Sequence, residues 1–187
     1  MIGPEFPQVL SAAARGDEEA FGRLWHDLQP RVLRYFAVVS AAAAEDLASE
    51  TWLGVVRGIE RFRGSEPAFR AWVFTIARHV ALDWRRRAAH RPTEDLAADG
   101  LLEQVAPDDP AAAAVEGFST RAALGLVATL PADQAEAVVL RVVAGLEVDR
   151  VAAIMGKRPG TVRVLTHRGL RRLAERLGDD ARIRRVV

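Results

Sequence analysis

The sequence LPADQAEAVVLRVVAGLEVDRVAAIMGKRPGTVRVLTHRGLRRLAERL, at Leu130–Leu177, contains three helical patterns in close succession. Turns at Gly145 and Gly156 separate them, because glycine enters the left-handed conformation at little cost. The third pattern opens at Pro159, which pre-sets the helical φ, and the side chain of Thr161 can accept a free backbone N–H there. A short helix, a tight turn and a longer helix together predict a helix-turn-helix unit.

The last helix of this stretch has an apolar side and a basic side. Its apolar positions recur at helical spacing and are Val162, Leu165, Gly169, Leu170 and Leu173. Its basic positions are Arg163, His167, Arg168, Arg171 and Arg172. The preceding helix has a matching apolar face at Val148, Val151, Ala152 and Met155. The basic side suits DNA binding by the helix-turn-helix unit. The alternative is an ordinary helical hairpin whose arginine face is solvated.

Composition limits the classes of protein that fit. Half of the 187 residues are apolar, which is enough for one or two packed domains. The absence of cysteine excludes a disulfide scaffold, thiolate metal sites and thiol catalysis. No early stretch has the length of a bilayer span or the pattern of a signal peptide, so we expect a cytoplasmic protein without membrane contact of its own. The opening MIGPEFPQ carries no weight in the predicted fold.

Charge is strongly segregated along the chain. Residues 157–187 contain one lysine and nine arginines against three acids. Residues 93–116 contain seven acids and no lysine or arginine, and residues 1–60 contain nine acids against five arginines. This segregation indicates different partners for different segments. The arginine side chain suits phosphate groups and guanine edges, although a bias toward arginine can equally reflect genomic base composition.

The first 62 residues show two stretches of helical periodicity. From Val9 to Val39 the pattern contains an N-cap at Asp17, and Pro30 is expected to open a second helix. From Ala43 to Phe62 we expect an inner face at Leu47, Thr51, Leu53, Gly54, Val55, Gly58, Ile59 and Phe62. The segment from Phe62 to Pro67 breaks this helix.

The segment from Ala68 to about Arg91 interleaves aromatic residues and arginines on one predicted helix. Aromatic rings can stack on bases and guanidinium groups can pair with phosphates, so this mixture suits nucleic-acid binding. For Phe69, Trp72 and Ile76 we favour the simpler alternative of core packing.

The segments assemble into an all-α chain of two small helical domains joined by an acidic linker, and no segment has strand periodicity. We expect a helical domain at residues 1–91, a flexible acidic linker at residues 92–117 and a helix-turn-helix domain at residues 118–187. A helix from about Ser119 to Thr129 opens the second domain. Beyond Leu177 we expect a short, solvated basic tail.

Several segments, in order, resemble those of bacterial sigma factors of the extracytoplasmic-function group. AEDLASETWL at residues 44–53 is similar to the segment that docks on the β′ clamp helices of core RNA polymerase. FRAWVFTIAR at residues 69–78 resembles the promoter-melting helix. Leu130-Pro131, GTVR at residues 160–163 and His167-Arg168 resemble the domain that reads the −35 element.

The resemblance implies three sets of site residues. Asp46, Leu47, Glu50 and Trp52 would contact polymerase. The set for recognition and melting of the −10 element is Arg63, Gly64, Ser65, Trp72, His79, Asp83, Trp84, Arg85, Arg86 and Arg87, in which the loop from Arg63 to Pro67 would capture a flipped base. The set for the −35 element is Arg158, Thr161, Arg163, Val164, His167, Arg168 and Arg171.

The chain departs from the family pattern at several of these places. Trp52 replaces a more usual phenylalanine, Ser49 a glutamine and His79 an asparagine. Val164-Leu165 replaces a serine-arginine pair, so the −35 preference is not carried over from relatives.

The predicted function is that of a sigma factor that directs promoter-specific transcription initiation. Its implied partners are the β′ and β subunits of core RNA polymerase, promoter DNA and an anti-sigma factor, with the acidic linker in a basic channel of polymerase. The alternative is a stand-alone helix-turn-helix regulator, which leaves the Asp46–Trp52 segment unexplained. The four histidines are scattered and no phosphate-binding glycine loop is present, so we expect no enzyme activity, no metal and no cofactor.

Overall fold

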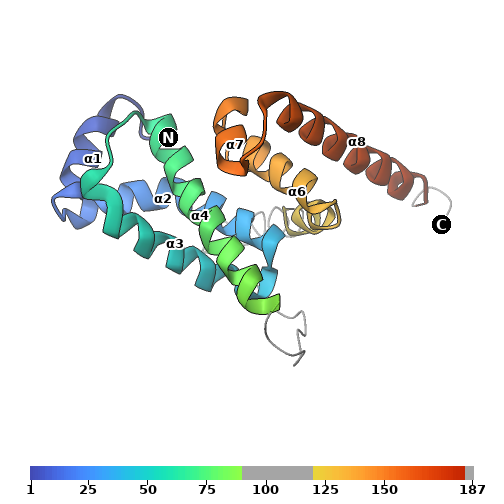
Figure 1. Cartoon of the computed structure of the whole chain (residues 1–187), viewed down its shortest axis with the longest axis horizontal. Coiled ribbons are helices and arrows are strands. Elements are labelled where there is room, and N and C mark those ends of the chain that lie inside the picture. Colours follow the sequence, from blue (N-terminus) through green and yellow to red (C-terminus); the bar gives the residue numbers. More distant parts are fainter. Residues whose placement is uncertain (90–119, 184–187) are drawn as a thin grey trace. The chain divides into compact units, whose positions relative to one another are not determined.

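The computed structural model describes residues 1–89 and 120–183, which fall into two compact units of packed helices (Figure 1). No strand occurs in these two ranges, which confirms the predicted all-α class. The predicted linker at residues 92–117 lies outside the described residues. No helix of the described part combines the length and the apolar character needed to cross a bilayer.

The N-terminal unit begins with a short 3₁₀ turn, η1 (Gly3–Glu5), and α1 (Phe6–Ala14), followed by the long helix α2 (Glu18–Val39). Asp17 caps α2, because its Oδ1 accepts the backbone N–H of Ala20 at 2.8 Å. This confirms the predicted N-cap. Helix α2 packs against α1 and presents Leu24, Leu28, Val32 and Phe36 to the core.

Two further helices complete this unit. A 3₁₀ turn, η2 (Ala41–Ala43), leads into α3 (Ala44–Gly58), and η3 (Ile59–Arg61) and a four-residue loop lead to α4 (Glu66–Ala89). Helix α3 packs against both α2 and α4. Glycines allow the close approach to α4: a Cβ atom at Gly54 would lie 2.8 Å from the Cγ2 of Ile76, and one at Gly58 would lie 2.8 Å from the Cζ2 of Trp72.

The C-terminal unit starts with a helix over residues 120–128 and continues with α6 (Ala132–Val138). A π-helical turn, η4 (Val139–Val143), leads to α7 (Val148–Met155) and then to α8 (Pro159–Ile183). Helix α8 packs on α6 and α7, and the buried Val162 and Gly169 lie at the contact. Gly145 and Gly156 have φ values of 66° and 65°, which confirms the two predicted turns.

The prediction that Pro30 opens a second helix is wrong, because α2 runs unbroken from Glu18 to Val39 with Pro30 inside it. A proline removes one helical hydrogen bond, here to the carbonyl of His26. Both residues are exposed, so water can reach that carbonyl. Buried side chains on either side of Pro30, at Leu28 and Val32, keep the helix on the core.

The opening segment contributes to the fold, contrary to the prediction. Phe6 is 3% exposed and packs against Phe69 with the ring centroids 5.7 Å apart. The expected loop from Arg63 to Pro67 is also shorter, because Glu66 and Pro67 form the first turn of α4. The backbone N–H of Phe69 donates to the carbonyl of Ser65 at 2.9 Å, which makes Ser65 the residue before the helix.

Three smaller corrections concern α3 and α8. Leu53 was expected on the inner face but is 59% exposed, and Leu170 was expected on the apolar stripe but is 44% exposed. The predicted start of α8 at Pro159 is confirmed, and Arg158 precedes the helix, because its carbonyl accepts the N–H of Val162 at 3.2 Å. The helix continues to Ile183 instead of ending at Leu177, so the expected tail is helical over residues 178–183.

Candidate nucleic-acid and polymerase interfaces

Helix α8 separates its buried and exposed residues cleanly. Val162 and Gly169 are buried, and Leu165 and Leu173 are half-buried, so these four residues form the packed side. All seven residues predicted for the −35 element are exposed, namely Arg158, Thr161, Arg163, Val164, His167, Arg168 and Arg171. The helix therefore leaves one extended basic face in solvent.

Two arginines near the middle of α8 make contacts within the chain. The Nε of Arg171 donates to Glu175 at 2.9 Å, one turn further along the helix. Arg172 donates to the Oε1 of Gln134 on α6 at 3.1 Å. Since Arg172 links α8 to α6 and Arg171 does not, the structure assigns a structural contact to Arg172 and leaves Arg171 on the outer face.

The −10 residues of α4 lie partly on one stripe of the helix. His79, Asp83 and Arg86 follow Trp72 at intervals of seven, four and three positions, which brings them to the same side. Trp84 instead continues the side of the buried Val73, Ala77 and Val80, and it is half-buried. Arg85, Arg86 and Arg87 are all exposed.

The loop between η3 and α4 brings Arg63, Gly64 and Ser65 to the surface next to Trp72. Arg63 closes the loop, because its Nη1 donates to the carbonyls of Glu60 and Phe62, at 2.7 Å each. The ring of Phe62 stacks on that of Trp72, with centroids 5.0 Å apart and an interplanar angle of 30°. The loop therefore rests on a packed aromatic base.

The predicted polymerase residues on α3 divide into an exposed pair and a buried pair. Asp46 is exposed and Glu50 half-buried, whereas Leu47 and Trp52 are 3% and 6% exposed. The indole N–H of Trp52 donates to Gln29 on α2 at 2.6 Å. Leu47 and Trp52 thus belong to the core of the unit, where they fix α3 against its neighbours.

Two outward apolar residues of α3 were missed by the sequence prediction. Leu53 and Val56 are 59% and 52% exposed and follow Glu50 at three-residue intervals, so they extend its side of the helix. Exposed large apolar side chains beside charged ones are typical of a protein-binding surface. The signal that could have identified them is their spacing from Asp46 and Glu50.

Acidic side chains pair with two arginines of α4. Arg87 lies 3.5 Å from Glu50 on α3, and Arg86 pairs with Asp83 one turn earlier. The hydrogen bond from Arg86, together with the positive charges of Arg86, Arg87 and His79, lowers the pKa of Asp83 below its ordinary value of 3.8. Asp83 therefore stays ionised and offsets part of the positive charge of this surface.

No group of three or more histidine, aspartate or glutamate side chains in the described ranges is arranged to hold a metal ion. The exposed groups of α3, α4 and α8 include arginines, apolar side chains, a few carboxylates, and the side chains of His79, Thr161 and His167. Such groups bind phosphates, bases and protein surfaces.

Both units match known protein families. A family model described as Sigma-70 region 2 matches residues 24–91, and one described as Sigma-70, region 4 matches residues 120–173. The ECF RNA polymerase sigma factor BldN of Streptomyces coelicolor is 36% identical over 177 residues, covering 94% of this chain and 67% of BldN. The ECF RNA polymerase sigma factor SigD of Mycobacterium tuberculosis is 32% identical, covering 97% of this chain and 89% of SigD.

Solved structures agree on the fold. CnrH, in complex with the cytosolic domain of CnrY, has a TM-score of 0.63 at 21% identity, covering 92% of this chain and 96% of CnrH. The sigma factor RpoE, in complex with the anti-sigma factor NepR from Bartonella quintana, has a TM-score of 0.62 at 24% identity, covering 84% and 96%. With both regions present in order and relatives aligned over nearly its whole length, the chain belongs to the extracytoplasmic-function group of RNA polymerase sigma factors.

Proposed function

We propose that this sigma factor directs core RNA polymerase to promoters by reading the −35 element with α8 and opening the −10 element with α4 and its preceding loop. The observation that carries the proposal is the uniform exposure of the seven predicted −35 residues on a helix whose other side is packed. We assign the two tasks to domains at residues 1–91 and 118–187, joined by the acidic linker at 92–117.

Reading the −35 element requires a helix in the major groove. Arg163 and Arg168 can each form paired hydrogen bonds with a guanine edge, and such a pair discriminates between bases by about 1–3 kcal/mol. Arg158 and Arg171 suit the flanking phosphates. Val164 presents an apolar side chain, 47% exposed, that suits a thymine methyl group.

Opening the −10 element depends on binding energy and needs no catalytic group. Unstacking a base costs a few kcal/mol, and stacking on an aromatic ring returns about 1–3 kcal/mol per base. In this proposal the loop at Arg63, Gly64 and Ser65 captures a flipped base. Trp72 and His79 lie along the unpaired strand, and Arg85, Arg86 and Arg87 contact its phosphates. Asp83 reduces the local positive charge, and the half-buried Trp84 supports this surface from the packed side of α4.

Polymerase docking involves the outward side of α3. We assign direct contacts to Asp46 and Glu50, and we add Leu53 and Val56 because of their exposure. Leu47 and Trp52 support this surface from the core. This assignment favours a sigma factor over a stand-alone regulator, and co-purification with core polymerase discriminates the two.

An anti-sigma factor is the further partner that we propose. Such a protein would cover the exposed Leu53 and Val56 and so compete with polymerase; the likeness to RpoE in complex with NepR supports this partner class. We also propose that the protein acts in the cytoplasm, where polymerase and promoter DNA are found, and that it has no enzyme activity of its own.

The assignment is tested by in vitro transcription with core enzyme and a library of promoters. The expected result is initiation from a subset of templates that share −35 and −10 sequences. Initiation no higher than with core enzyme alone, despite a folded protein, would contradict the proposal.

A point substitution tests the role of α8. Arg168→Ala should reduce discrimination at one −35 position by about tenfold, in line with the loss of one paired arginine–guanine contact, while polymerase binding stays unchanged. The matched control is Arg176→Ala, an exposed arginine two turns further on that contacts Thr129. Equal loss of −35 discrimination and polymerase binding would identify Arg168 as a structural residue instead.

A further inference from the structure

Two consecutive backbone N–H groups at the start of the chain converge on one carboxylate. Ile2 has right-handed helical angles, with φ −78° and ψ −31°, and Gly3 has a φ of +73°. A right-handed residue followed by a left-handed one forms an anion-binding concavity, or nest. Glu66 occupies it: its Oε1 accepts the N–H of Ile2 and its Oε2 that of Gly3, at 3.0 Å each.

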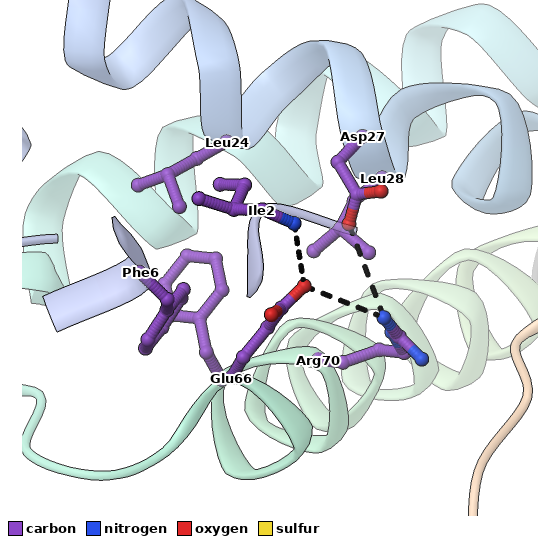
Figure 2. A pocket seen from close by; sticks show the side chains of 8 residues that line it. Ile2, Phe6, Leu24, Asp27, Leu28, Glu66 and Arg70 are labelled. Atoms are coloured by element: carbon purple, nitrogen blue, oxygen red, sulfur yellow. Dashed lines mark hydrogen bonds and ion pairs between the residues drawn. The ribbon is translucent and has the colours of Figure 1, made fainter. Parts of the chain in front are cut away.

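Glu66 is also the first residue of α4, directly after the loop Phe62–Ser65. Its carboxylate therefore ties the point where this loop ends to the N-terminal segment. Arg70, one turn along α4 and 8% exposed, lies 3.8 Å from Glu66 and 4.0 Å from Asp27 on α2 (Figure 2). The cluster is thus anchored to two helices.

The cavity beside this cluster is small. Its volume is about 10 Å³, and Ile2, Phe6, Leu24 and Leu28 are among the residues that line it (Figure 2). A cavity of this size holds at most about one water molecule. This cavity is therefore too small to bind a cofactor or a larger ligand. Its charged groups instead hold the neighbouring segments together.

A second connection runs from the same segment to the loop through aromatic rings. Phe6 packs against Phe69, with centroids 5.7 Å apart, and Phe69 packs against Phe62 at 5.3 Å. Phe62, the first residue of the loop, stacks on Trp72. One end of the loop is therefore held through Phe62 and the other through Glu66, and both connections lead back to Ile2–Phe6.

We propose that Ile2–Phe6 is a brace that positions the loop Phe62–Ser65, with Glu66 as the positioning residue that the brace holds. This inference rests on the proposed role of that loop in capturing a −10 base. The nest fixes where the loop ends, so losing the nest allows the loop to move relative to Trp72. The brace then determines how sharply the −10 base is discriminated, without itself touching DNA.

Gly3 offers a substitution with a matched control. A side chain at Gly3 meets no atom within 4 Å, but its φ of +73° disfavours any L-residue, so Gly3→Ala should open the nest by backbone strain alone. Gly16, in the turn between α1 and α2, has a φ of +89° and equally open surroundings, and its backbone N–H donates to the carbonyl of Ala13 at 3.0 Å within its own turn. Gly16→Ala therefore introduces comparable strain without touching the brace.

The experiment compares holoenzymes made with wild-type chain, Gly3→Ala, Gly16→Ala, Glu66→Gln and an Arg63→Ala/Ser65→Ala loop variant. The measured quantities are open-complex formation on templates that differ at single −10 positions, −35 discrimination, polymerase affinity and thermal stability. We expect Gly3→Ala and Glu66→Gln to reduce −10 discrimination by about threefold to tenfold, in line with the net contribution of about one hydrogen bond. Gly16→Ala should change it by less than about twofold, and polymerase affinity and −35 discrimination should be unchanged in all three.

The outcomes separate this inference from the function on which it rests. If the loop variant leaves −10 discrimination unaltered, the assignment of the loop to the −10 element fails. If the loop variant reduces −10 discrimination but Gly3→Ala behaves like Gly16→Ala, the brace is overturned and the loop assignment stands. Should Gly3→Ala fail to fold, Glu66→Gln decides the question, since a loss of polymerase affinity and −10 discrimination together would mean that the cluster is merely structural.

Discussion

Asp83 illustrates how a single side chain sets the charge of the α4 surface. Its side chain is 43% exposed and it accepts a hydrogen bond from Arg86, so at neutral pH the pair presents less positive charge than the sequence RRR suggests. Glu50 does the same to Arg87 from the neighbouring helix. Exposed pairs of this kind contribute little to stability and exchange easily, so DNA phosphates can take the place of the carboxylates.

The charge state of Asp83 gives a prediction at the residue scale. Because its pKa is lowered in the folded protein, its contribution to stability is present above the ordinary value of 3.8 and is lost as the pH falls through the folded pKa. Arg86→Ala should move the pKa of Asp83 upward, toward 3.8, in an NMR titration of the side-chain carboxyl. Arg85→Ala serves as the control, and an equal upward shift in both variants would contradict the assigned cause.

At the scale of the element, close approach of helices depends on a few glycines. A Cβ atom at Gly169 of α8 would lie 2.7 Å from the Cγ2 of Val138 and 3.4 Å from the Cδ1 of Leu130. Val138 is buried and β-branched, so its methyl group has little freedom to move aside. The distance between α6 and α8 is therefore set by the absence of a side chain at Gly169.

Gly169→Ala should accordingly destabilise the C-terminal unit by about 1–3 kcal/mol, the usual cost of overpacking a core. Gly160→Ala on the same helix meets no atom within 4 Å and should be neutral or slightly stabilising, because alanine favours helix. Thermal unfolding followed by circular dichroism measures both. A Gly169→Ala protein as stable as the Gly160→Ala protein would mean that α8 can move away from α6 at no cost.

The elements that local signals determine were predicted well, and those that packing determines were not. Gly145, Gly156 and the cap at Asp17 act within one turn of chain, so their effect is visible in the sequence. The prediction at Pro30 is wrong because the burial of side chains on both sides of it outweighs one lost helical hydrogen bond. That burial depends on residues distant in sequence, so it is not visible in the local pattern.

The same distinction applies to the candidate sites. The basic side of α8 follows from helical spacing, and every residue assigned to it is exposed. On α3, the apolar residues alone fit more than one inner face, so Trp52 was expected outside and Leu53 inside. Only the spacing of Leu53 from the charged Asp46 and Glu50 distinguishes these faces. The link between Ile2, Gly3 and Glu66 joins positions more than 60 residues apart through backbone groups, which no sequence pattern reports.

At the scale of the whole molecule, the chain forms two separately packed units, and in the proposed function they divide the work of promoter recognition. Each unit has its own core, and residues 93–116 of the sequence contain seven acids and no lysine or arginine. A −35 element and a −10 element lie at a fixed separation on DNA. Two linked DNA-binding units bind with full avidity only when the distance between them matches the distance between the two DNA elements.

The free sigma factor should therefore protect promoter DNA weakly, and core polymerase should strengthen protection of both elements together by setting the separation of the two units. DNase footprinting with and without core enzyme measures this effect. The control is a template in which the spacing between the −35 and −10 elements is lengthened by about five base pairs, roughly half a helical turn. Tight, sequence-specific protection of both elements by the chain alone would contradict the prediction.

The glycines of α3 have a practical consequence for engineering. Gly54 and Gly58 lie against Ile76 and Trp72 on α4, while Leu53 and Val56 on the same helix face outward. Under the proposed docking role, a mutant library intended to change affinity for polymerase can vary Leu53 and Val56 without disturbing the contact between α3 and α4. A side chain at Gly54 or Gly58 would instead push α4 away from α3, so such a library should keep both glycines.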